Sequence, residues 1–255
     1  MTDISFLNRL RRLEIERVLP DLAGGTHVLE FGSGTGEQAR FLVEQGFEVT
    51  AIDLASSNYA DLRLFPVQDY DGRNIPLPDR SVDVIYSSNV LEHVENFDEV
   101  LAEFRRVLKP DGYAVHVLPT TAWRFWTFAS AIADSLKAAV ALPVRLARPA
   151  GQSRARVLKR EIRHIGSGFI PRAHGTAPEG ISELWSFSTP AWKRKFRRCG
   201  FRVMADRPMG LFYTGTTLAG DALSIETRGR LSRLFGSATR VYLLKVDDRK
   251  AATRD

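Results

Sequence analysis

The sequence predicts an α/β fold in which helices cover both faces of a seven-stranded, mostly parallel sheet, with a lid insertion after the fifth strand. Three observations predict it. Short apolar segments alternate with amphipathic ones between residues 27 and 118, a glycine-rich turn follows the first apolar segment, and the alternation resumes after residue 187. Such alternation is typical of parallel sheets, whose functional sites lie at the carboxyl ends of the strands.

The first half of the chain supplies five of the expected strands and two helices. In the second helix, Leu101, Phe104 and Leu108 recur on one face, as an amphipathic helix requires. Gly46 ends the first helix, and a Lys-Pro-Asp-Gly break ends the second. The strands are expected at 27–31, 47–53, 64–68, 82–87 and 113–118, and the helices at 37–45 and 97–108.

Residues 120–187 interrupt this rhythm with aromatic clusters, arginines and Gly/Pro breaks, and show no clear strand. The sheet pattern resumes with a helix that begins near Ser188, and further strands are expected at 201–205 and 240–246. We therefore expect a single domain over residues 1–255. Its parts are a cofactor-binding core (21–118), a basic and aromatic insertion (119–187) and a segment that completes the sheet (188–246).

Charge is divided unevenly along the chain. The net charge is +6, yet residues 21–118 hold 7 basic and 17 acidic side chains, while residues 121–210 hold 17 basic and 5 acidic ones. A basic segment beside an acidic core indicates either a solvated surface or contact with an anionic partner. The single cysteine, Cys199, excludes an internal disulfide and fits a reducing compartment. Residues 1–20 show no apolar signal segment, so we expect a cytoplasmic protein.

The strongest motif is the turn EFGSGTG at residues 30–36, after a strand and before a helix. Glycines let the backbone approach a ligand closely, and a helix N-terminus presents free N–H groups. The third glycine, Gly36, comes one position earlier than in the dinucleotide fingerprint. Glu30 and Glu37 also disfavour a pyrophosphate and favour a cationic ligand such as S-adenosylmethionine. Asp53, at the end of the second strand, can accept both hydroxyls of a ribose.

In these motifs the chain resembles the small-molecule branch of class I S-adenosylmethionine-dependent methyltransferases, which includes quinone-biosynthesis enzymes. Six segments in order carry the resemblance: VLEFGSGTG (28–36), ID (52–53), IPLPD (75–79), VDVI (82–85), VLEHV (90–94) and RRVLKPDG (105–112). The resemblance implies a Rossmann-like fold, an S-adenosyl-L-methionine cofactor and methyltransferase activity.

The resemblance also implies roles for individual residues. It places Glu30 at the methionine amino group, Asp69 and Tyr70 beside the adenine, and Ser88 and Asn89 on the sulfonium side. Because the stretch after Asp69 is longer than usual, Asp71 is the alternative adenine contact. The full predicted cofactor set is Glu30, Gly32, Ser33, Gly34, Gly36, Asp53, Leu54, Asp69, Tyr70, Ser88 and Asn89.

His93 is the predicted catalytic residue. A hydroxyl acceptor benefits from a general base, and His93 is the titratable side chain nearest the end of the fourth strand. The alternative interpretation is that it only holds the strand-to-helix turn. His164 and His174 lie in the insertion, and nothing in the sequence aims them at a site. No metal-ligand spacing is present, so the sequence predicts no metal site.

The insertion is expected to select the acceptor. Trp123 and Trp126 directly follow the fifth strand and are predicted to bind the substrate. The apolar stretch behind them is interrupted by Asp134, Lys137 and Pro143, so we expect it not to cross a bilayer. Bordered by basic residues, including Arg148 and Arg154, it could lie on an anionic membrane surface, or it could be an ordinary lid helix.

A second resemblance ranks the acceptors. Residues 119–124 and 182–188 are similar to bacterial methyltransferases of polysaccharide and glycolipid synthesis, which implies O-methylation of a sugar or lipid-linked glycan at the cytoplasmic membrane face. A quinone or another small acceptor is the alternative. Nucleic acid is disfavoured because residues 87–90 lack the Asn/Asp-Pro-Pro-aromatic motif of amino-methylating DNA enzymes. A non-catalytic S-adenosylmethionine-binding protein is the non-enzyme alternative.

Overall fold

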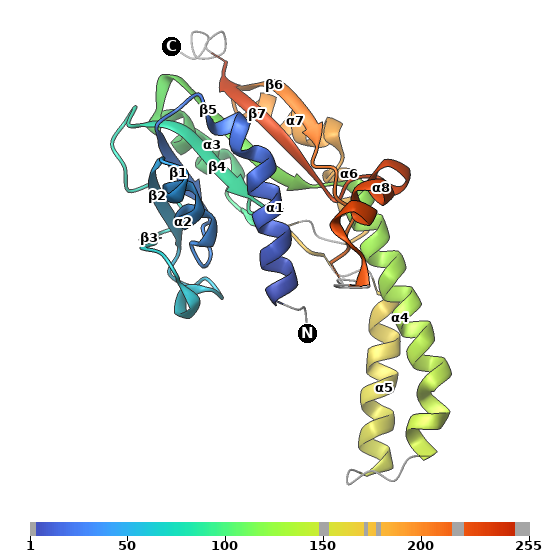
Figure 1. Cartoon of the computed structure of the whole chain (residues 1–255). Helices are drawn as coiled ribbons and strands as arrows, with labels where there is room; N and C mark the ends of the chain where they lie inside the picture. The colour runs from blue at the N-terminus through green and yellow to red at the C-terminus, as the bar shows by residue number, and fades with distance from the viewer. Residues whose placement is uncertain (1–3, 148–152, 171–172, 177–179, 216–221, 248–255) are drawn as a thin grey trace.

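One seven-stranded sheet runs through the protein, in the strand order β3-β2-β1-β4-β5-β7-β6 (Figure 1). The computed structural model describes residues 4–147, 153–170, 173–176, 180–215 and 222–247. The first five strands are parallel, and β7 pairs antiparallel with both β5 and β6. The strands are β1 (His27–Phe31), β2 (Glu48–Leu54), β3 (Gln68–Tyr70), β4 (Val82–Ser88), β5 (Leu108–Pro119), β6 (Phe201–Pro208) and β7 (Thr239–Val246).

Helices cover both faces of this sheet, which confirms the predicted α/β fold. The helical elements are α1 (Ile4–Leu22), α2 (Glu37–Glu44), η1 (Ala60–Leu62), η2 (Leu91–His93), α3 (Phe97–Val107), α4 (Thr121–Ala147), α5 (Arg154–Gly168), α6 (Glu183–Ser186), α7 (Thr189–Arg198) and α8 (Ile225–Phe235). In α3, Val100, Leu101 and Phe104 are buried on one face at helical spacing. Ser188 caps α7 by accepting from the N–H of Ala191.

The third strand lies later in the chain than predicted. We expected residues 64–68, but the strand covers Gln68–Tyr70. Leu64 is exposed, and its N–H donates to the carbonyl of Thr35 in the glycine-rich loop. The residues before β3 therefore pack over this loop instead of extending the sheet.

The N-terminal helix α1 was not predicted from the sequence. Its buried residues, among them Leu10, Ile15 and Val18, pack into the core of the domain. Glu14 is fully buried, and its Oε1 accepts hydrogen bonds from the Tyr213 hydroxyl (2.7 Å) and the Thr239 hydroxyl (2.6 Å). A buried carboxylate with two hydroxyl donors thus joins the first helix to the last part of the chain.

The insertion expected over residues 119–187, as a lid or a membrane-facing element, contains a helical hairpin. Helices α4 and α5 pack side by side as a hairpin that projects away from the sheet, and only the base of this hairpin meets the body of the domain (Figure 1). At that base Arg124 is buried, and its Nε lies 2.9 Å from Oε2 of Glu183. A buried ion pair therefore fixes the first turn of α4.

The apolar stretch that the sequence predicts to be too interrupted to cross a membrane forms a single long helix, α4. Thr121–Val144 forms 24 residues of helix with a hydropathy of 1.3, which is long and apolar enough for a span by length and composition alone. Only 17% of the 18-residue apolar segment of this helix is buried in the protein. Arg148 and the Arg154 side chain, two of the basic groups expected beside this stretch, lie outside the described residues.

Candidate functional site

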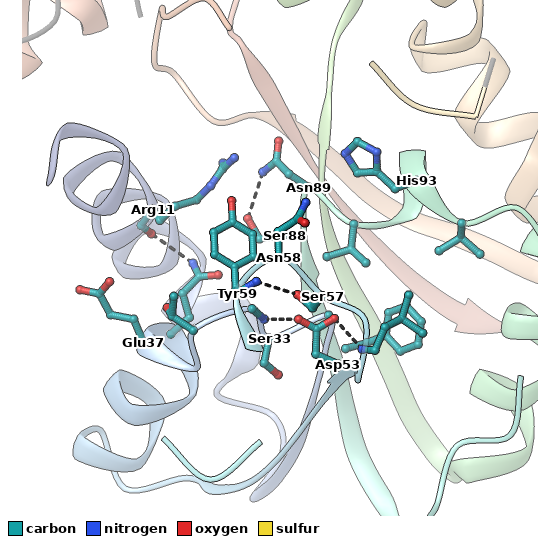
Figure 2. A pocket seen from close by; sticks show the side chains of 18 of the residues that line it. Arg11, Ser33, Glu37, Asp53, Ser57, Asn58, Tyr59, Ser88, Asn89 and His93 are labelled. Atoms are coloured by element: carbon teal, nitrogen blue, oxygen red, sulfur yellow. Dashed lines mark hydrogen bonds between the residues drawn. The ribbon is translucent and has the colours of Figure 1, made fainter. Parts of the chain in front are cut away.

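A pocket of about 940 Å³ opens at the carboxyl ends of β1, β2 and β4, where a parallel sheet is expected to hold its ligand (Figure 2). The glycine-rich loop after β1 forms one wall, and the residues after β2 form a second. The sequence-predicted residues that line it are Gly32, Ser33, Gly34, Asp53, Leu54, Tyr70, Ser88, Asn89, His93 and Trp123.

The glycine-rich loop requires glycine for steric reasons. Gly32, Gly34 and Gly36 all have positive φ, at 75°, 55° and 74°. A Cβ on Gly32 would lie 2.5 Å from a methyl group of Val90, and one on Gly36 would lie 2.7 Å from Cβ of Phe65. Gly32 and Gly34 therefore bring bare backbone to the pocket wall, while Gly36 forms the turn into α2 and does not line the pocket.

Asp53 connects the end of β2 to this loop. Its Oδ2 accepts from the N–H of Gly34 (2.9 Å), and its Oδ1 accepts from the N–H of Leu54 (2.8 Å), so the carboxylate is held at the pocket edge (Figure 2). Each carboxylate oxygen keeps a further lone pair. The side chain can therefore accept two ligand hydroxyls, as predicted for a ribose.

Glu30 lies beneath the loop instead of in the pocket wall. It is 2% exposed, it is not among the lining residues, and its Oε2 has no hydrogen-bond partner among the described residues. Burial raises the pKa of Glu30 to about 8. The role of Glu30 at a ligand amino group therefore stays a prediction.

The two carboxylates predicted as alternative adenine contacts, Asp69 and Asp71, lie outside the pocket lining. Asp69 forms an ion pair with Arg63 (2.9 Å between Oδ1 and Nη2), and the alternative residue, Asp71, accepts from the N–H groups of Arg73 and Asn74. Neither carboxylate lines the pocket, whereas the buried Tyr70 does. Asp71 thus caps its own turn.

The segment after β2 contributes residues that sequence reasoning missed: Ser57, Asn58 and Tyr59 line this side of the pocket (Figure 2). The half-exposed Tyr59 ring lies over the glycine-rich loop, 3.5 Å from where a Cβ on Gly34 would be. No motif marked these residues, and their position follows from the turn after β2.

Helix α1 closes another wall that sequence reasoning missed. Arg11 lines the pocket, and its Nη1 donates to Oε2 of Glu14 (2.5 Å). The Gln38 amide, from α2, donates to the carbonyl of Arg11 and to the Tyr86 hydroxyl, both at 3.2 Å. The spacing of Leu10, Glu14 and the apolar residues after it was the available signal for this helix.

Aromatic and imidazole rings gather at the far end of the pocket. Trp123 packs against His174 with ring centroids 4.7 Å apart, and His174 packs against His93 at 4.8 Å. Burial lowers the pKa of His93, so its ring is neutral at pH 7 and can accept a proton. Asn89 has a φ of 55° and donates to the Ser88 hydroxyl, which holds both residues at the end of β4.

Trp126 corrects the other half of the substrate prediction. Its indole N–H donates to the carbonyl of Phe235 (2.9 Å), and its ring packs against Phe212 and Phe235. Trp126 is not among the pocket-lining residues. Residues three apart are neighbours on a helix surface, so it is these contacts with Phe212 and Phe235, not helix geometry, that keep Trp126 outside the pocket and fix α4 to α8.

Comparison with known proteins gives concordant matches. Residues 29–116 match the family described as "Methyltransferase domain". The chain is 33% identical over 109 residues to a malonyl-[acyl-carrier protein] O-methyltransferase from Pectobacterium atrosepticum, covering 40% of this chain and 43% of that protein. It is 34% identical over 110 residues to a demethylmenaquinone methyltransferase from Corynebacterium urealyticum, covering 41% and 46%. The chain therefore spans less than half the length of these two curated relatives.

The fold is also similar to a solved structure. The crystal structure of a SAM-dependent methyltransferase from Archaeoglobus fulgidus superposes with a TM-score of 0.53 at 18% identity, covering 93% of each chain. This likeness concerns the fold as a whole. The family match covers residues 29–116, from β1 to β5.

Proposed function

The protein carries a class I S-adenosylmethionine-dependent methyltransferase domain, and on this premise we propose that it methylates a hydroxyl of a sugar or lipid-linked glycan at the cytoplasmic membrane face. One observation carries the proposal: the pocket that begins at the glycine-rich loop ends at Trp123, in the first turns of the projecting α4–α5 hairpin. The glycine-rich loop that would hold the methyl donor and the candidate membrane-facing hairpin therefore line the same pocket.

The donor side of the pocket suits S-adenosylmethionine. Gly32 and Gly34 offer bare backbone, Asp53 offers an acceptor pair for ribose hydroxyls, and Tyr70 and Tyr59 offer aromatic surface to a base. A dinucleotide would bring a pyrophosphate to a loop flanked by Glu37 and Asp53, both of which line the pocket. The cationic sulfonium ligand is the better electrostatic match.

The acceptor side suits displacement at the methyl carbon. The acceptor oxygen forms a bond to this carbon while the carbon–sulfur bond breaks, so the leaving group is neutral S-adenosylhomocysteine. Alignment supplies much of the rate in such a reaction. The proton of the acceptor hydroxyl passes to His93, whose burial keeps its ring unprotonated at pH 7. Ser88 and Asn89 lie between this ring and the donor loop (Figure 2).

The hairpin presents an apolar and basic surface. Leu136, Val140 and Val144 are exposed at four-residue spacing on α4, and Leu158 and Ile162 are exposed at the same spacing on α5. Four exposed basic residues flank the α5 stripe: Arg156, Lys159, Arg160 and Arg163. Apolar stripes bordered by cations are typical of helices that lie in the interface of an anionic membrane.

Cofactor binding is the first experiment. Titration calorimetry with S-adenosylhomocysteine should give micromolar affinity for the wild type and no heat with NAD. Asp53→Ala should weaken binding roughly 10- to 100-fold, because it removes charge-assisted hydrogen bonds worth about 1.5–3 kcal/mol. The control is Asp61→Ala on η1, which is outside the pocket lining. Equal affinity in the Asp53 variant and the wild type would remove the proposed ribose contact.

Sedimentation with liposomes tests the membrane part. The wild type should sediment with vesicles containing phosphatidylglycerol, but not with phosphatidylcholine alone, and salt should release it. Changing the four hairpin cations to Glu should abolish sedimentation and leave cofactor affinity unchanged. A control with the same change in charge uses four exposed arginines elsewhere on the domain: Arg73, Arg194, Arg202 and Arg233. If both sets behave alike, the hairpin is not a membrane contact.

A prenylated quinone is the second candidate acceptor, favoured by the similarity to a demethylmenaquinone methyltransferase. A quinone precursor is also a membrane-resident acceptor, so the liposome experiment does not separate it from a glycolipid. Methyl transfer from labelled S-adenosylmethionine to lipid-linked glycan and to demethylquinone extracts does. A protein that binds the cofactor and never releases S-adenosylhomocysteine with either extract would fit the non-catalytic alternative instead.

A further inference from the structure

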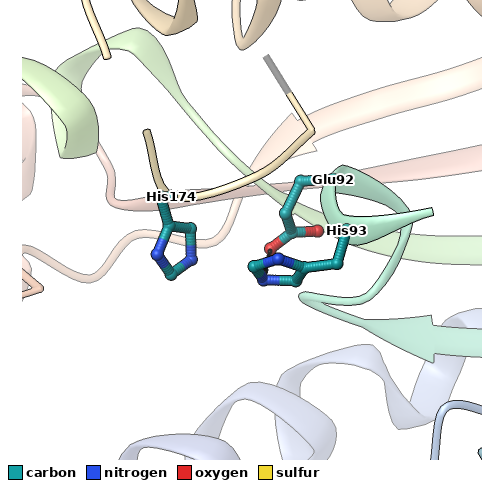
Figure 3. Close-up of side chains that lie close together, drawn as sticks. All are labelled: Glu92, His93 and His174. Atoms are coloured by element: carbon teal, nitrogen blue, oxygen red, sulfur yellow. Dashed lines mark ion pairs between the residues drawn. The ribbon is translucent and has the colours of Figure 1, made fainter. Parts of the chain in front are cut away.

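Three metal-ligand side chains meet at the acceptor end of the pocket (Figure 3). Glu92 and His93 belong to η2, and His174 lies 81 positions later in the chain, in a segment that packs against η2. One ligand atom from each residue lies within 4.8 Å of the other two. The sequence predicted no metal site because such a distant pairing leaves no spacing motif.

Glu92 is the most unusual member of this cluster. Its side chain is fully buried, and neither carboxylate oxygen has a hydrogen-bond partner among the described residues. The Arg11 guanidinium, which lines the same pocket, donates to Glu14 instead. A buried carboxyl without a partner either holds a proton, as Glu30 does, or binds a cation, and Glu92 differs from Glu30 in having two imidazoles beside it that can share a cation.

The opposite ring is held in place by specific contacts. The Thr176 N–H donates to the carbonyl of Glu92 (2.9 Å), and a Cβ on Gly175 would lie 2.3 Å from that carbonyl oxygen. The N–H groups of His174 and Gly175 both donate to Oε1 of Glu183 at 2.6 Å. These hydrogen bonds are made by backbone N–H groups, so they hold His174 beside η2 while its imidazole ring takes no part in them.

Both rings also suit a metal chemically. Each is exposed and lines the pocket, and the neutral form of an imidazole offers a nitrogen lone pair, as a metal ligand must. Two imidazoles and a carboxylate form a donor set that divalent first-row transition ions favour, whereas Mg²⁺ favours oxygen ligands alone.

We propose that Glu92, His93 and His174 form a binding site for a divalent transition-metal ion such as Zn²⁺, with its remaining coordination positions open to the pocket. Metal–ligand bonds near 2.0–2.2 Å require ligand atoms roughly 3.3 Å apart. The half-exposed His93 ring, whose Nε2 lies 3.9 Å from Oε1 of Glu92, can close this distance by a small rotation.

The open coordination positions would bind oxygen atoms of the acceptor. With the lone pair of His93 on the ion, the charge of the ion would take over from His93 the task of promoting loss of the acceptor proton. This use of the site rests on the proposed function, whereas the metal site itself does not. The site borders Trp123, and a sugar with neighbouring hydroxyls could chelate the ion while its ring lies on the indole. An acceptor with one isolated hydroxyl would gain much less from the same ion.

Metal titration tests the site without cofactor or acceptor. Chelator-treated protein should bind Zn²⁺ in calorimetry at low micromolar concentration, and Co²⁺ should give visible d–d absorption bands, while millimolar Mg²⁺ gives neither signal. Glu92→Gln, His93→Ala and His174→Ala should each weaken Zn²⁺ binding at least roughly tenfold, since even outer-shell changes cost 10- to 100-fold. His164→Ala, an exposed histidine on α5, is the control and should bind as the wild type does.

The Glu92→Gln variant guards against misfolding as an explanation. An amide is easier to bury than an unpaired carboxylate, so this variant should unfold at the same or a higher temperature than the metal-free wild type, yet lose the Zn²⁺-induced increase. Wild-type protein that ignores Zn²⁺ and Co²⁺, or a Glu92→Gln variant that binds Zn²⁺ with unchanged affinity, overturns the proposal. Either result leaves S-adenosylhomocysteine binding, and hence the proposed methyltransferase function, untouched.

Discussion

The glycine-rich loop and the α4–α5 hairpin border the same pocket, but different forces determine their shapes. The loop is fixed by backbone: Gly32 has a positive φ, its neighbours crowd it, and Asp53 binds the N–H of Gly34. The hairpin is fixed by the close contact of two helices, and much of its apolar surface stays exposed. The backbone at the donor end is therefore held in one conformation, whereas the hairpin at the acceptor end carries exposed apolar surface that a further partner would bury.

Gly32→Ala should produce the largest effect on the donor end. The new methyl group would lie 2.5 Å from Val90 at a φ of 75°, so the loop must move. We expect a loss of roughly 1–3 kcal/mol of stability and at least about a 100-fold loss of S-adenosylhomocysteine affinity, measured by chemical unfolding and calorimetry.

Gly46→Ala is the matched control for this variant. Gly46 has a φ of 92°, but no atom lies within 4 Å of the position that a Cβ would occupy, so only the left-handed backbone cost of about 1–2 kcal/mol applies. Cofactor affinity should not change. If both variants bind the cofactor equally well, crowding at Val90 does not define the loop.

Glu30→Gln should change the pH dependence of stability. The pKa of Glu30 is raised from 4.5 to about 8, so the folded protein keeps this proton where the unfolded chain has lost it. The stabilisation is complete below about pH 4.5 and is lost as the pH rises toward 8. Urea unfolding should show the variant gaining roughly 2–4 kcal/mol over the wild type at pH 8 and little at pH 4.5. Parallel pH profiles would refute the buried, protonated Glu30.

Gly168→Ala should act on the hairpin alone. A Cβ there would lie 1.9 Å from the Ser135 hydroxyl and 2.5 Å from the carbonyl of Ala131, so α5 must separate from α4 at this point. We expect a loss of about 1–3 kcal/mol and faster amide exchange in the hairpin, with unchanged cofactor affinity. Gly166→Ala, where no atom lies within 4 Å, should show none of this loss. Weakened cofactor binding in Gly168→Ala would mean that the two ends are mechanically coupled.

Val140→Ser should have the smallest effect on stability. This side chain is 81% exposed on α4, so unfolding should shift by no more than about 0.5 kcal/mol. Its binding to anionic liposomes should nevertheless fall, because the apolar stripe loses its most exposed member. Leu234→Ser, a similar change on α8 at 77% exposure, should leave liposome binding as it was. Identical sedimentation of both variants would argue against the stripe.

The sequence-predicted residues that line the pocket share a local cause. Gly32 and Gly34 occupy the turn after β1, and Asp53 lies at the end of β2, so spacing along the chain determines their positions. His174 and Arg11 reach the pocket through contacts with elements far away in the sequence, with η2 for His174 and with Tyr213 for Arg11, and no local pattern records these contacts. The resemblance implied that Asp69 lies beside the adenine, but an ion pair with Arg63 holds its carboxylate outside the pocket lining, and no local pattern records that ion pair.

The buried Glu14 has a consequence for how the protein is made. Its carboxylate receives hydrogen bonds from residues 199 and 225 positions later in the chain, yet its helix supplies the Arg11 wall of the pocket. During synthesis from the N-terminus, this wall lacks both hydrogen bonds to the end of the chain until the ribosome has released β7. We expect a nascent chain that already contains the whole glycine-rich loop and Asp53 to hold its cofactor more weakly than the 255-residue chain does.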